Sequence, residues 1–258
     1  MRSERLAVPE PPARHLPWPN CSNVRELGGY PIAGGGQVRW RALLRGDNLC
    51  RLTPEGCSTL VDYGVRTIID VRSASELALA RHPFRGRESR PDRPVYLNLP
   101  LLDEADVMGT EALSDLESPQ QVNESILERY RGQIAAVVRG IAAAPPGAVL
   151  IHCHAGKDRT GLIIALVLAL IGVPESVIAD DYAASNIYLQ PLYEEMLADA
   201  SEDPVRRERL ARNLVCQPET VFDTLRFLDN RYGGVRSYLA SAGLTQRDID
   251  QLHCRIGA

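Results

Sequence analysis

Several features are scarce or missing in this chain of 258 residues. Lysine occurs once, as Lys157, so the other 28 basic residues are arginines. Aromatic residues make up only 5% of the sequence, and the six cysteines include no Cys-x2-Cys pair. The formal net charge of −4 provides no basic surface of the kind that binds nucleic acid, and the cysteine spacing matches no zinc pattern. We therefore expect no nucleic-acid partner, no metal and no other cofactor.

Long apolar runs are also missing, and residues 1–19 show no apolar signal-peptide core. The apolar stretch 162–173 is too short to span a bilayer, so it predicts a core helix and no transmembrane segment. Residues 1–19 contain five prolines and no apolar period, which predicts a disordered or draped tail before one domain over 20–258. Without a signal-peptide pattern we expect reduced thiols in the cytoplasm, and export without a signal peptide stays open.

Residues 148–161 are the most informative stretch of the chain. The short β-branched run 148–152 predicts a buried strand, and the longer Leu- and Ala-rich run from 162 predicts a helix. A tight loop between a strand and a helix aims several backbone N–H groups, and the partial positive charge of the helix, at one point. The stretch therefore predicts an anion-binding loop. Carboxylate or sulfate would be accepted there, but phosphate fits best.

The side chains in this loop indicate a nucleophile beside an anion-binding site. The field that attracts an anion also favours the thiolate form of Cys153, which makes that residue a nucleophile. Arg159 offers a planar fork of donors that matches two phosphate oxygens. The only lysine of the chain, Lys157, lies in the same loop, which indicates a specific role for a compact positive charge. His152 and His154 have no third ligand at a workable spacing, so we do not expect a metal here.

The pattern Cys-x5-Arg-Thr resembles the signature loop of the cysteine-dependent protein tyrosine phosphatases. The fuller string 152–161, His-Cys-His-Ala-Gly-Lys-Asp-Arg-Thr-Gly, is similar to the atypical bacterial branch of that family. Segments 23–29, 45–49 and 181–186 resemble further motifs of the branch, in the same order. The resemblance implies a single α/β domain with a central, mostly parallel sheet flanked by helices, and with the signature loop between a strand and a helix.

The resemblance also implies roles for individual residues. Cys153 would form a phosphocysteine intermediate that water hydrolyses, and Thr160 would help the thiolate leave. Asp158 is the favoured general acid, and Asp103 is the competing one. Lys157 would add positive charge for a substrate with more than one anionic group, such as a phosphoinositide.

Further residues are candidate substrate contacts. The loop residues His154, Ala155 and Gly156 would contribute backbone amides. Arg45 and Asp47 lie beside the phosphate loop in the resembling branch, with a structural ion pair that braces a hairpin as the alternative. Arg72 follows a predicted buried strand, at the edge where open α/β sheets bind ligands. Its alternative role is a salt bridge across the loop mouth.

The rest of the pattern predicts the scaffold. A glycine cluster at 34–36 predicts a hairpin within 20–52, and the acidic segment 103–120 suits a lid or loop. That segment is shorter than in a mycobacterial member of the branch, so we expect no full two-helix lid and a site open to bulky substrates. Strands are predicted at 65–71 and 95–99, and further helices at 53–63, 121–143, 174–182, 188–200, 218–231, 235–242 and 245–255.

Two functions remain open at this point. The first is a phosphomonoester hydrolase of the tyrosine or dual-specificity type, extending to phosphoinositides, which acts on a phosphorylated protein or lipid. The second is a phosphatase of a small metabolite such as a nucleoside or sugar phosphate, because no aromatic residue stands out as a partner for phosphotyrosine. A nucleotide-binding loop is excluded, since Ile151 stands where its first glycine belongs and Asp158 follows the lysine. A rhodanese-like sulfur carrier is disfavoured because Arg159 and Thr160 suit phosphate.

Overall fold

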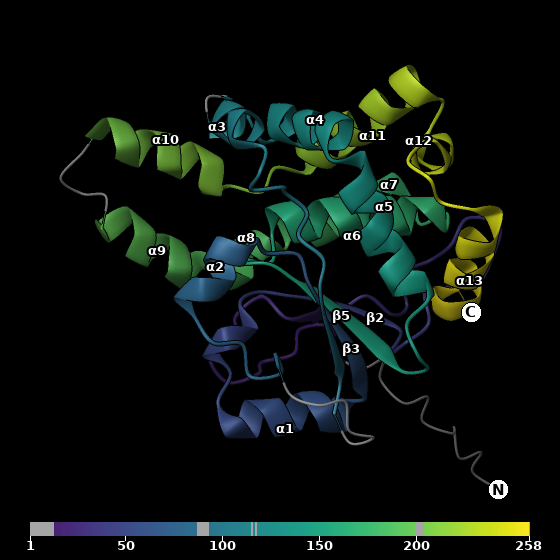
Figure 1. Cartoon of the computed structure of the whole chain (residues 1–258), viewed down its shortest axis with the longest axis horizontal. Helices are drawn as coiled ribbons and strands as arrows, with labels where there is room; N and C mark the ends of the chain where they lie inside the picture. The colour runs from purple at the N-terminus through teal and green to yellow at the C-terminus, as the bar shows by residue number, and fades with distance from the viewer. Residues whose placement is uncertain (1–12, 87–92, 115, 117, 200–203, 258) are drawn as a thin grey trace, which may run out of the picture.

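A computed structural model describes residues 13–86, 93–114, 116, 118–199 and 204–257 (Figure 1). Its centre is a five-stranded sheet with the order β1-β2-β5-β3-β4. All neighbouring strands are parallel except β1 and β2, which pair antiparallel. The predicted α/β fold with a mostly parallel central sheet is confirmed. The strands are β1 (Arg25–Glu26), β2 (Leu43–Gly46), β3 (Val65–Asp70), β4 (Val95–Asn98) and β5 (Ala148–His152).

Strand β5 lies in the middle of the sheet, and its side chains alternate between two cores. Val149 and Ile151 belong to the large core under the helices, while Ala148 and Leu150 belong to a smaller core on the opposite face. All five residues of β5 are buried. This continuous burial is typical of a parallel strand that is covered on both faces, and it explains why the run 148–152 is apolar throughout.

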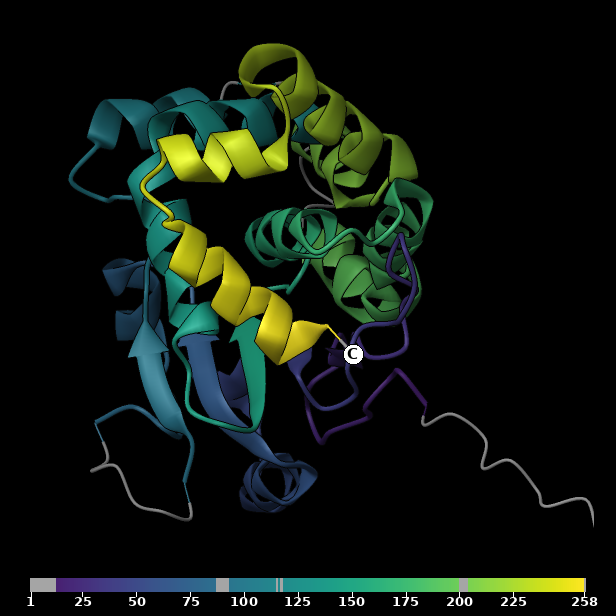
Figure 2. The ribbon, with the colours of Figure 1, turned by 90° about the vertical axis from the view of Figure 1, so that its right-hand side faces the viewer.

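Helices cover the two faces unequally, with α1 on one side of the sheet and most of the others on the opposite side (Figure 1). The C-terminal helix α13 packs along α5 (Figure 2). In chain order the helices are η1 (Leu49–Arg51), α1 (Pro54–Tyr63), α2 (Ala74–Leu79), α3 (Val107–Ser114), α4 (Pro119–Arg129), α5 (Arg131–Ala142), α6 (Asp158–Leu170), α7 (Glu175–Ala183), α8 (Ser185–Tyr188), α9 (Gln190–Asp199), α10 (Pro204–Leu214), α11 (Pro218–Tyr232), α12 (Val235–Ser241) and α13 (Gln246–Ile256).

Helix α6 starts at the end of the loop that follows β5 and runs through the core. Nearly all of its residues from Thr160 to Leu170 are buried, so its direction is set by packing on every side. Because β5 and α6 are both held in this way, the short segment between them has little freedom. No helix in the described part of the chain combines the length and the apolar character that crossing a membrane requires.

Three expectations about helices need correction. The helix predicted over 121–143 is two helices, because Tyr130 leaves the helical region with φ −112° and ψ 35° between α4 and α5. Residues 107–114, expected to be part of a lid or loop, form α3. The helices α2 and α10 were not predicted. The first of these omissions matters for the site, since α2 opens with a capping box between Ser73 and Glu76.

The N-terminal region packs more closely than expected. The antiparallel pair β1–β2 and the bridge between Pro31 and Gln37 form the hairpin-like unit around the glycine cluster. Trp18 is buried in the smaller core, and His15 bridges to Arg25. The packed chain therefore includes residues before position 20. Residues 1–12 of the predicted tail lie outside the described residues.

Candidate active site

The loop between β5 and α6 contains the residues singled out from the sequence. Cys153 follows β5 directly and is buried, with 3% of its surface exposed. Gly156 has φ +69°, and a Cβ at this position would lie 2.4 Å from the carbonyl oxygen of Gly46. Only glycine combines this backbone conformation with such a close approach. The end of β2 therefore sets the path of the loop.

The carbonyl groups of the loop are held on its outer side. Asn23 donates a hydrogen bond to the carbonyl of Ala155 (2.9 Å), and Arg45 donates to the carbonyl of Gly156 (2.6 Å). His152 Nδ1 contacts the carbonyl of Cys153 (3.2 Å). In a trans peptide the C=O of one residue and the N–H of the next point in opposite directions. Three N–H groups, those of residues 154, 156 and 157, therefore point to the inner side of the loop, where they can bind an anion.

A buried ion network supports the loop from behind. Asp181 on α7 pairs with Arg45 (2.5 Å) and with Arg25 (3.4 Å). Burial alone would raise the pKa of Asp181, but the two arginines outweigh it and lower the pKa below its ordinary value. Arg25 also bonds Asn23 and the hydroxyl of Ser185. Strand β1, strand β2 and helix α7 are thus connected behind the loop between β5 and α6.

Arg45 and Asp47, expected as substrate contacts, have structural partners instead. The side chain of Arg45 is 1% exposed and bonds Asp181 and the loop. Asp47 is buried and accepts the backbone N–H groups of Ser22 (2.9 Å) and Asn23 (3.2 Å), which fixes the approach to β1. Burial raises the pKa of Asp47, and these hydrogen bonds lower it only in part. Both residues brace the site, but through separate partners rather than as the ion pair considered from the sequence.

Arg159, in the first turn of α6, is held by an acid that was not predicted. Its Nη1 and Nη2 bond the two carboxylate oxygens of Glu76 at 2.5 and 2.7 Å. Burial opposes the ionisation of Glu76, but the hydrogen bonds and charge of Arg159 outweigh it and lower the pKa of Glu76 to about 2. A guanidinium keeps further N–H donors after binding one carboxylate. The position of Arg159 is thus set while donors remain for phosphate.

The two candidate acids occupy different surroundings. Asp158 lies beside Arg159 at the start of α6, and its side chain is 54% exposed toward a cleft. The protein around this half-exposed carboxyl displaces part of its hydration and raises the pKa of Asp158, and the charges of Lys157 and Arg159 oppose the rise only in part. Asp103 is exposed, does not line this cleft, and accepts the N–H of Ala105 in its own turn (3.0 Å). The surroundings of Asp158 suit a proton donor better.

Lys157 points into the protein. Its side chain is 4% exposed, and Nζ donates to the carbonyl of Leu214 (3.1 Å) and lies 3.6 Å from Asp158 Oδ1. The same amine lies over the ring of Tyr193 on α9, 5.7 Å from its centroid. These contacts connect the loop to the ends of α9 and α10. Lys157 is not among the described residues that line the cleft.

Thr160 and His154 differ in burial. The Oγ1 atom of Thr160 is fully buried and has no hydrogen-bond partner among the described residues, so this hydroxyl is able to donate to a group in the loop. His154 is exposed, and Ala155 is half-buried. The anion-binding arrangement described above therefore depends on the loop amides and not on the His154 ring.

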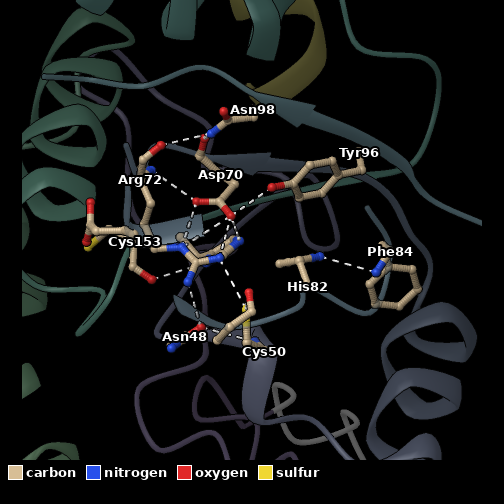
Figure 3. A network of polar contacts seen from close by, with 12 residues as sticks. Asn48, Cys50, Asp70, Arg72, His82, Phe84, Tyr96, Asn98 and Cys153 are labelled. Carbon is tan, nitrogen blue, oxygen red and sulfur yellow. Dashed lines mark hydrogen bonds and ion pairs between the residues drawn. The ribbon is translucent and has the colours of Figure 1, made fainter. Parts of the chain in front are cut away.

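Arg72 lies in a polar network under the loop (Figure 3). It bonds both oxygens of Asp70, with Nη2 at 2.7 Å from Oδ2, and it also bonds Asn48 Oδ1 (3.1 Å) and Cys50 Sγ (3.3 Å). Its side chain is 1% exposed. The expected substrate contact is therefore wrong for this arrangement, and the alternative of a salt bridge holds. Asp70 also accepts from the hydroxyl of Tyr96 (2.9 Å).

Asp70, His82 and His152 offer three buried ligand atoms within 4.8 Å of one another. Their chemistry does not suit a cation. Asp70 is already paired with Arg72, whose charge would repel a metal ion. His82 Nδ1 accepts the N–H of Phe84 (3.2 Å), which leaves hydrogen on Nε2, the atom that would bind the metal. Burial lowers the pKa of both histidines, to about 3 for His82 and about 4 for His152, so both are neutral at pH 7.

A cleft of about 620 Å³ opens beside Arg159 and Asp158. Helices α3 and α4 and the segment after β4 form one wall, and the starts of α2 and α6 form the other. The polar wall includes Ser73, Glu76, Asp158 and Arg159. The aliphatic side chains of the opposite wall are Leu102, Leu113, Leu116, Val122 and Ile126.

Sequence reasoning missed some of the residues that complete this site. Glu76 was detectable in principle, because Ser-x-x-Glu after a buried strand is a capping-box signature. Asp181 and Asn23 lay in segments that resemble family motifs, but no local pattern connects them to residues 155 and 156. Their contacts with the site depend on the sheet order and on the position of α7.

The sequence of this chain is similar to those of several known proteins. The sequence model described as tyrosine phosphatase family matches residues 16–256. The chain is 34% identical to a tyrosine-protein phosphatase of Nostoc commune over 228 residues, which cover 84% of this chain and 74% of the relative. It is 29% identical to a putative tyrosine-protein phosphatase of Cupriavidus necator, covering 97% and 93%. It is 28% identical to the triple specificity protein phosphatase PtpB of Mycobacterium tuberculosis, covering 91% and 96%.

Proposed function

Because this chain belongs to the tyrosine phosphatase family, a family of cysteine-based phosphatases, we propose that it hydrolyses phosphate monoesters through a phosphocysteine intermediate on Cys153. The observation that carries the proposal is the orientation of the loop. Asn23 and Arg45 hold two carbonyls outward beside a buried cysteine, and the N–H groups of residues 156 and 157 point inward. Arg159 completes the anion site from the start of α6.

In the first step the Cys153 thiolate attacks phosphorus, and a sulfur–phosphorus bond forms as the bond to the leaving oxygen breaks. Arg159 and the loop amides stabilise the charge on the other phosphate oxygens, which is the largest contribution in such reactions. Asp158 gives its proton to the leaving oxygen. Its raised pKa keeps a proton available to higher pH than an ordinary carboxyl would allow.

In the second step water attacks phosphorus and the sulfur–phosphorus bond breaks. The Asp158 carboxylate takes the proton from the water, and inorganic phosphate leaves. The buried hydroxyl of Thr160 has no partner among the described residues, so it can donate to the departing thiolate. The enzyme returns to its starting state with no cofactor in the cycle.

The substrate we propose is a monoester with one phosphate, of the phosphotyrosine type. Phosphoinositides with several phosphates fit less well, because Arg159 is the only cation among the described residues that line the cleft. The mostly aliphatic wall argues against a sugar phosphate or a nucleotide, because Thr110, Ser118 and Asn123 are its only polar side chains in the described lining and could satisfy few of their polar groups.

The test is phosphate release from p-nitrophenyl phosphate and phosphotyrosine, compared between the wild type and Cys153→Ser. We expect turnover in the wild type and none above background in the variant. Acid quenching during turnover should yield a phosphorylated peptide that contains Cys153, detected by mass spectrometry. Wild-type turnover in Cys153→Ser would overturn the proposal.

A further inference from the structure

One wall of the cleft is mostly aliphatic, with Thr110, Ser118 and Asn123 as its polar side chains in the described lining. On α4, Pro119, Val122, Asn123 and Ile126 line the cleft at the spacing of one helix face. Leu113 of α3 and Leu102 extend this surface, and no aromatic side chain belongs to the described lining. Sequence periodicity alone would assign Val122 to the core, but it is only half-buried and borders the cleft. The wall therefore exposes apolar surface to the cleft as well as packing against the core.

The wall is held in place from behind. Asp106, just before α3, bonds Arg129 at the end of α4 through both carboxylate oxygens. Asp106 also accepts a hydrogen bond from the hydroxyl of Tyr130 (3.1 Å). Hydrogen bonding to Arg129 lowers the pKa of Asp106 to about 2, so this connection persists through the neutral range. The aliphatic side chains therefore form a preorganised surface.

The charges around the cleft limit what a bound molecule can carry. Arg159 faces the phosphate loop, while Glu76 and Asp158 are the other charged groups of the described lining. Lys157 is buried, bonds the carbonyl of Leu214 and lies 3.6 Å from Asp158, and it is not among the described residues that line the cleft. A second phosphate on the substrate would meet two carboxyl groups and no further cation. The cleft selects against such a group.

The volume indicates a large leaving group. About 620 Å³ lies within the range of pockets that enclose drug-sized ligands, and the phosphoryl group needs only the end near Arg159. A peptide on this wall would bring an N–H and a C=O group with every residue, more than Thr110, Ser118 and Asn123 can satisfy. A hydrocarbon needs no such partner, and its burial is favourable by itself.

We infer that the wall formed by α3 and α4 is a hydrocarbon-binding subsite, and that the enzyme prefers singly phosphorylated esters of hydrophobic alcohols. This inference rests on the proposed phosphatase function and deepens it. The phosphoryl group occupies the loop, and the hydrocarbon part of the leaving group lies along Val122, Ile126 and Leu113.

The test uses phenyl phosphates with a para-alkyl chain of increasing length, because the chain changes the apolar area with little effect on the leaving oxygen. In the wild type we expect kcat/KM to rise about fourfold per added methylene until the wall is covered. Val122→Thr keeps the shape of the side chain but replaces a methyl by a hydroxyl, and it should reduce this slope. Leu113→Asn should reduce it as well, and serves if the first variant does not fold.

Val177→Thr is the matched control, since Val177 is a half-buried valine of α7 outside the cleft lining. It should keep the wild-type slope. A second arm compares alkyl chains that end in a methyl group with chains that end in a second phosphate, and the second group should lower kcat/KM at least tenfold.

The outcomes separate the inference from the proposed function. A flat series with turnover that depends on Cys153 would overturn the inference and leave the phosphatase function intact. A loss of turnover on every substrate would overturn both. Faster hydrolysis of the doubly phosphorylated series would overturn the inference. So would a length dependence seen only in phosphotyrosine peptides with apolar neighbours, which would identify a peptide groove.

Discussion

Two arginines beside the phosphate loop are used in different ways. Arg45, behind the loop, is 1% exposed, and it bonds Asp181 and the carbonyl of Gly156. Arg159, on the cleft side, has a side chain that is 17% exposed and is held by Glu76 on one edge only. The first arginine orients the backbone, and the second keeps donors for a ligand. Burial and satisfied donors, rather than residue type, distinguish an arginine that positions the loop from one that keeps donors available for a ligand.

This comparison predicts that substitution of the arginine on the cleft side causes the largest loss of activity. Arg159→Ala should lower kcat by about 10³-fold or more, because it removes the charge that stabilises the transition state. The fold should persist, since α6 is anchored by its apolar residues. The measurement is p-nitrophenyl phosphate hydrolysis together with a circular dichroism spectrum. A loss of less than tenfold in a folded variant would mean that Arg159 does not bind the transferring phosphate.

Behind the loop we expect the largest loss of stability. Asp181→Asn should lower the free energy of unfolding by about 3–5 kcal/mol, because it leaves Arg25 and Arg45 buried without a counter-charge. The measurement is urea unfolding, and Asp180→Asn at the neighbouring exposed position is the matched control, expected within about 0.5 kcal/mol of the wild type.

The pH dependence of stability tests the same pair. The folded pKa of Asp181 is lowered, so its contribution is present above the ordinary carboxyl pKa and is lost as the pH falls through the folded value. The difference in stability between the wild type and Asp181→Asn should shrink on acidification below about pH 4. A constant difference down to the acid transition would argue against the ion network.

Substitution of Asp158, the proposed general acid, is the next test of the cleft side. Asp158→Asn should lower kcat by about 10²-fold for a substrate with a poor leaving group and by less for p-nitrophenyl phosphate. Because the acid works in its protonated form, the wild-type rate should fall as the pH rises through the raised pKa of Asp158. The variant should lose that limb of the pH–rate profile. Asp103→Asn is the control, and a larger loss in that variant would reverse the assignment.

Glu76→Gln should have a smaller effect, since it loosens Arg159 without removing it. We expect kcat/KM to fall about tenfold, with most of the change in kcat if the position of Arg159 matters mainly in the transition state. Glu104→Gln is the control, because Glu104 is an exposed acid that bonds the N–H of Ser75 near the same helix start. Equal effects of the two substitutions would mean that Glu76 acts only through the cap of α2.

The smallest expected effect concerns Lys157, and it also tests an expectation from the sequence. Lys157→Met should lower turnover by roughly threefold, and equally for esters with one phosphate and with several, because the amine contacts Leu214 and Asp158 rather than the cleft. Steady-state kinetics on both kinds of ester provides the measurement. A selective loss on the multiply phosphorylated esters would restore the role expected from the sequence, a second charge for polyanionic substrates.

Features that depend on neighbouring residues in the chain were predicted from the sequence, and features without a local signal were missed. Thr53, Pro54 and Gly64 delimit α1 as predicted, because capping is decided within one turn. The break at Tyr130 was missed, since neither a proline nor a glycine occupies that position. Because α2 was not predicted, its residue Glu76, the partner of Arg159, was missed as well.

The roles of the arginines were harder to predict, because most of their partners are distant in the sequence. A salt bridge of Arg72 across the loop mouth was one of the two alternatives from the sequence, but its partner Asp70, two residues away, was not named. Arg45 bonds Asp181, which lies on another element and far along the chain. Nothing in the local sequence of residues 45–49 distinguishes a residue that faces substrate from one that faces Asp181.

Residues 148–161 alone were enough to predict a strand, an anion-binding loop, a nucleophile and a helix, because those features depend on neighbours in the chain. The tertiary structure decided which side of the loop each charge occupies. Packing of β2 and α7 behind the loop turned Arg45 away from substrate, and the capping of α2 brought Glu76 to Arg159. The separation of α4 from α5 placed an aliphatic helix face along the cleft. These outcomes required the whole core, because long-range contacts determine them.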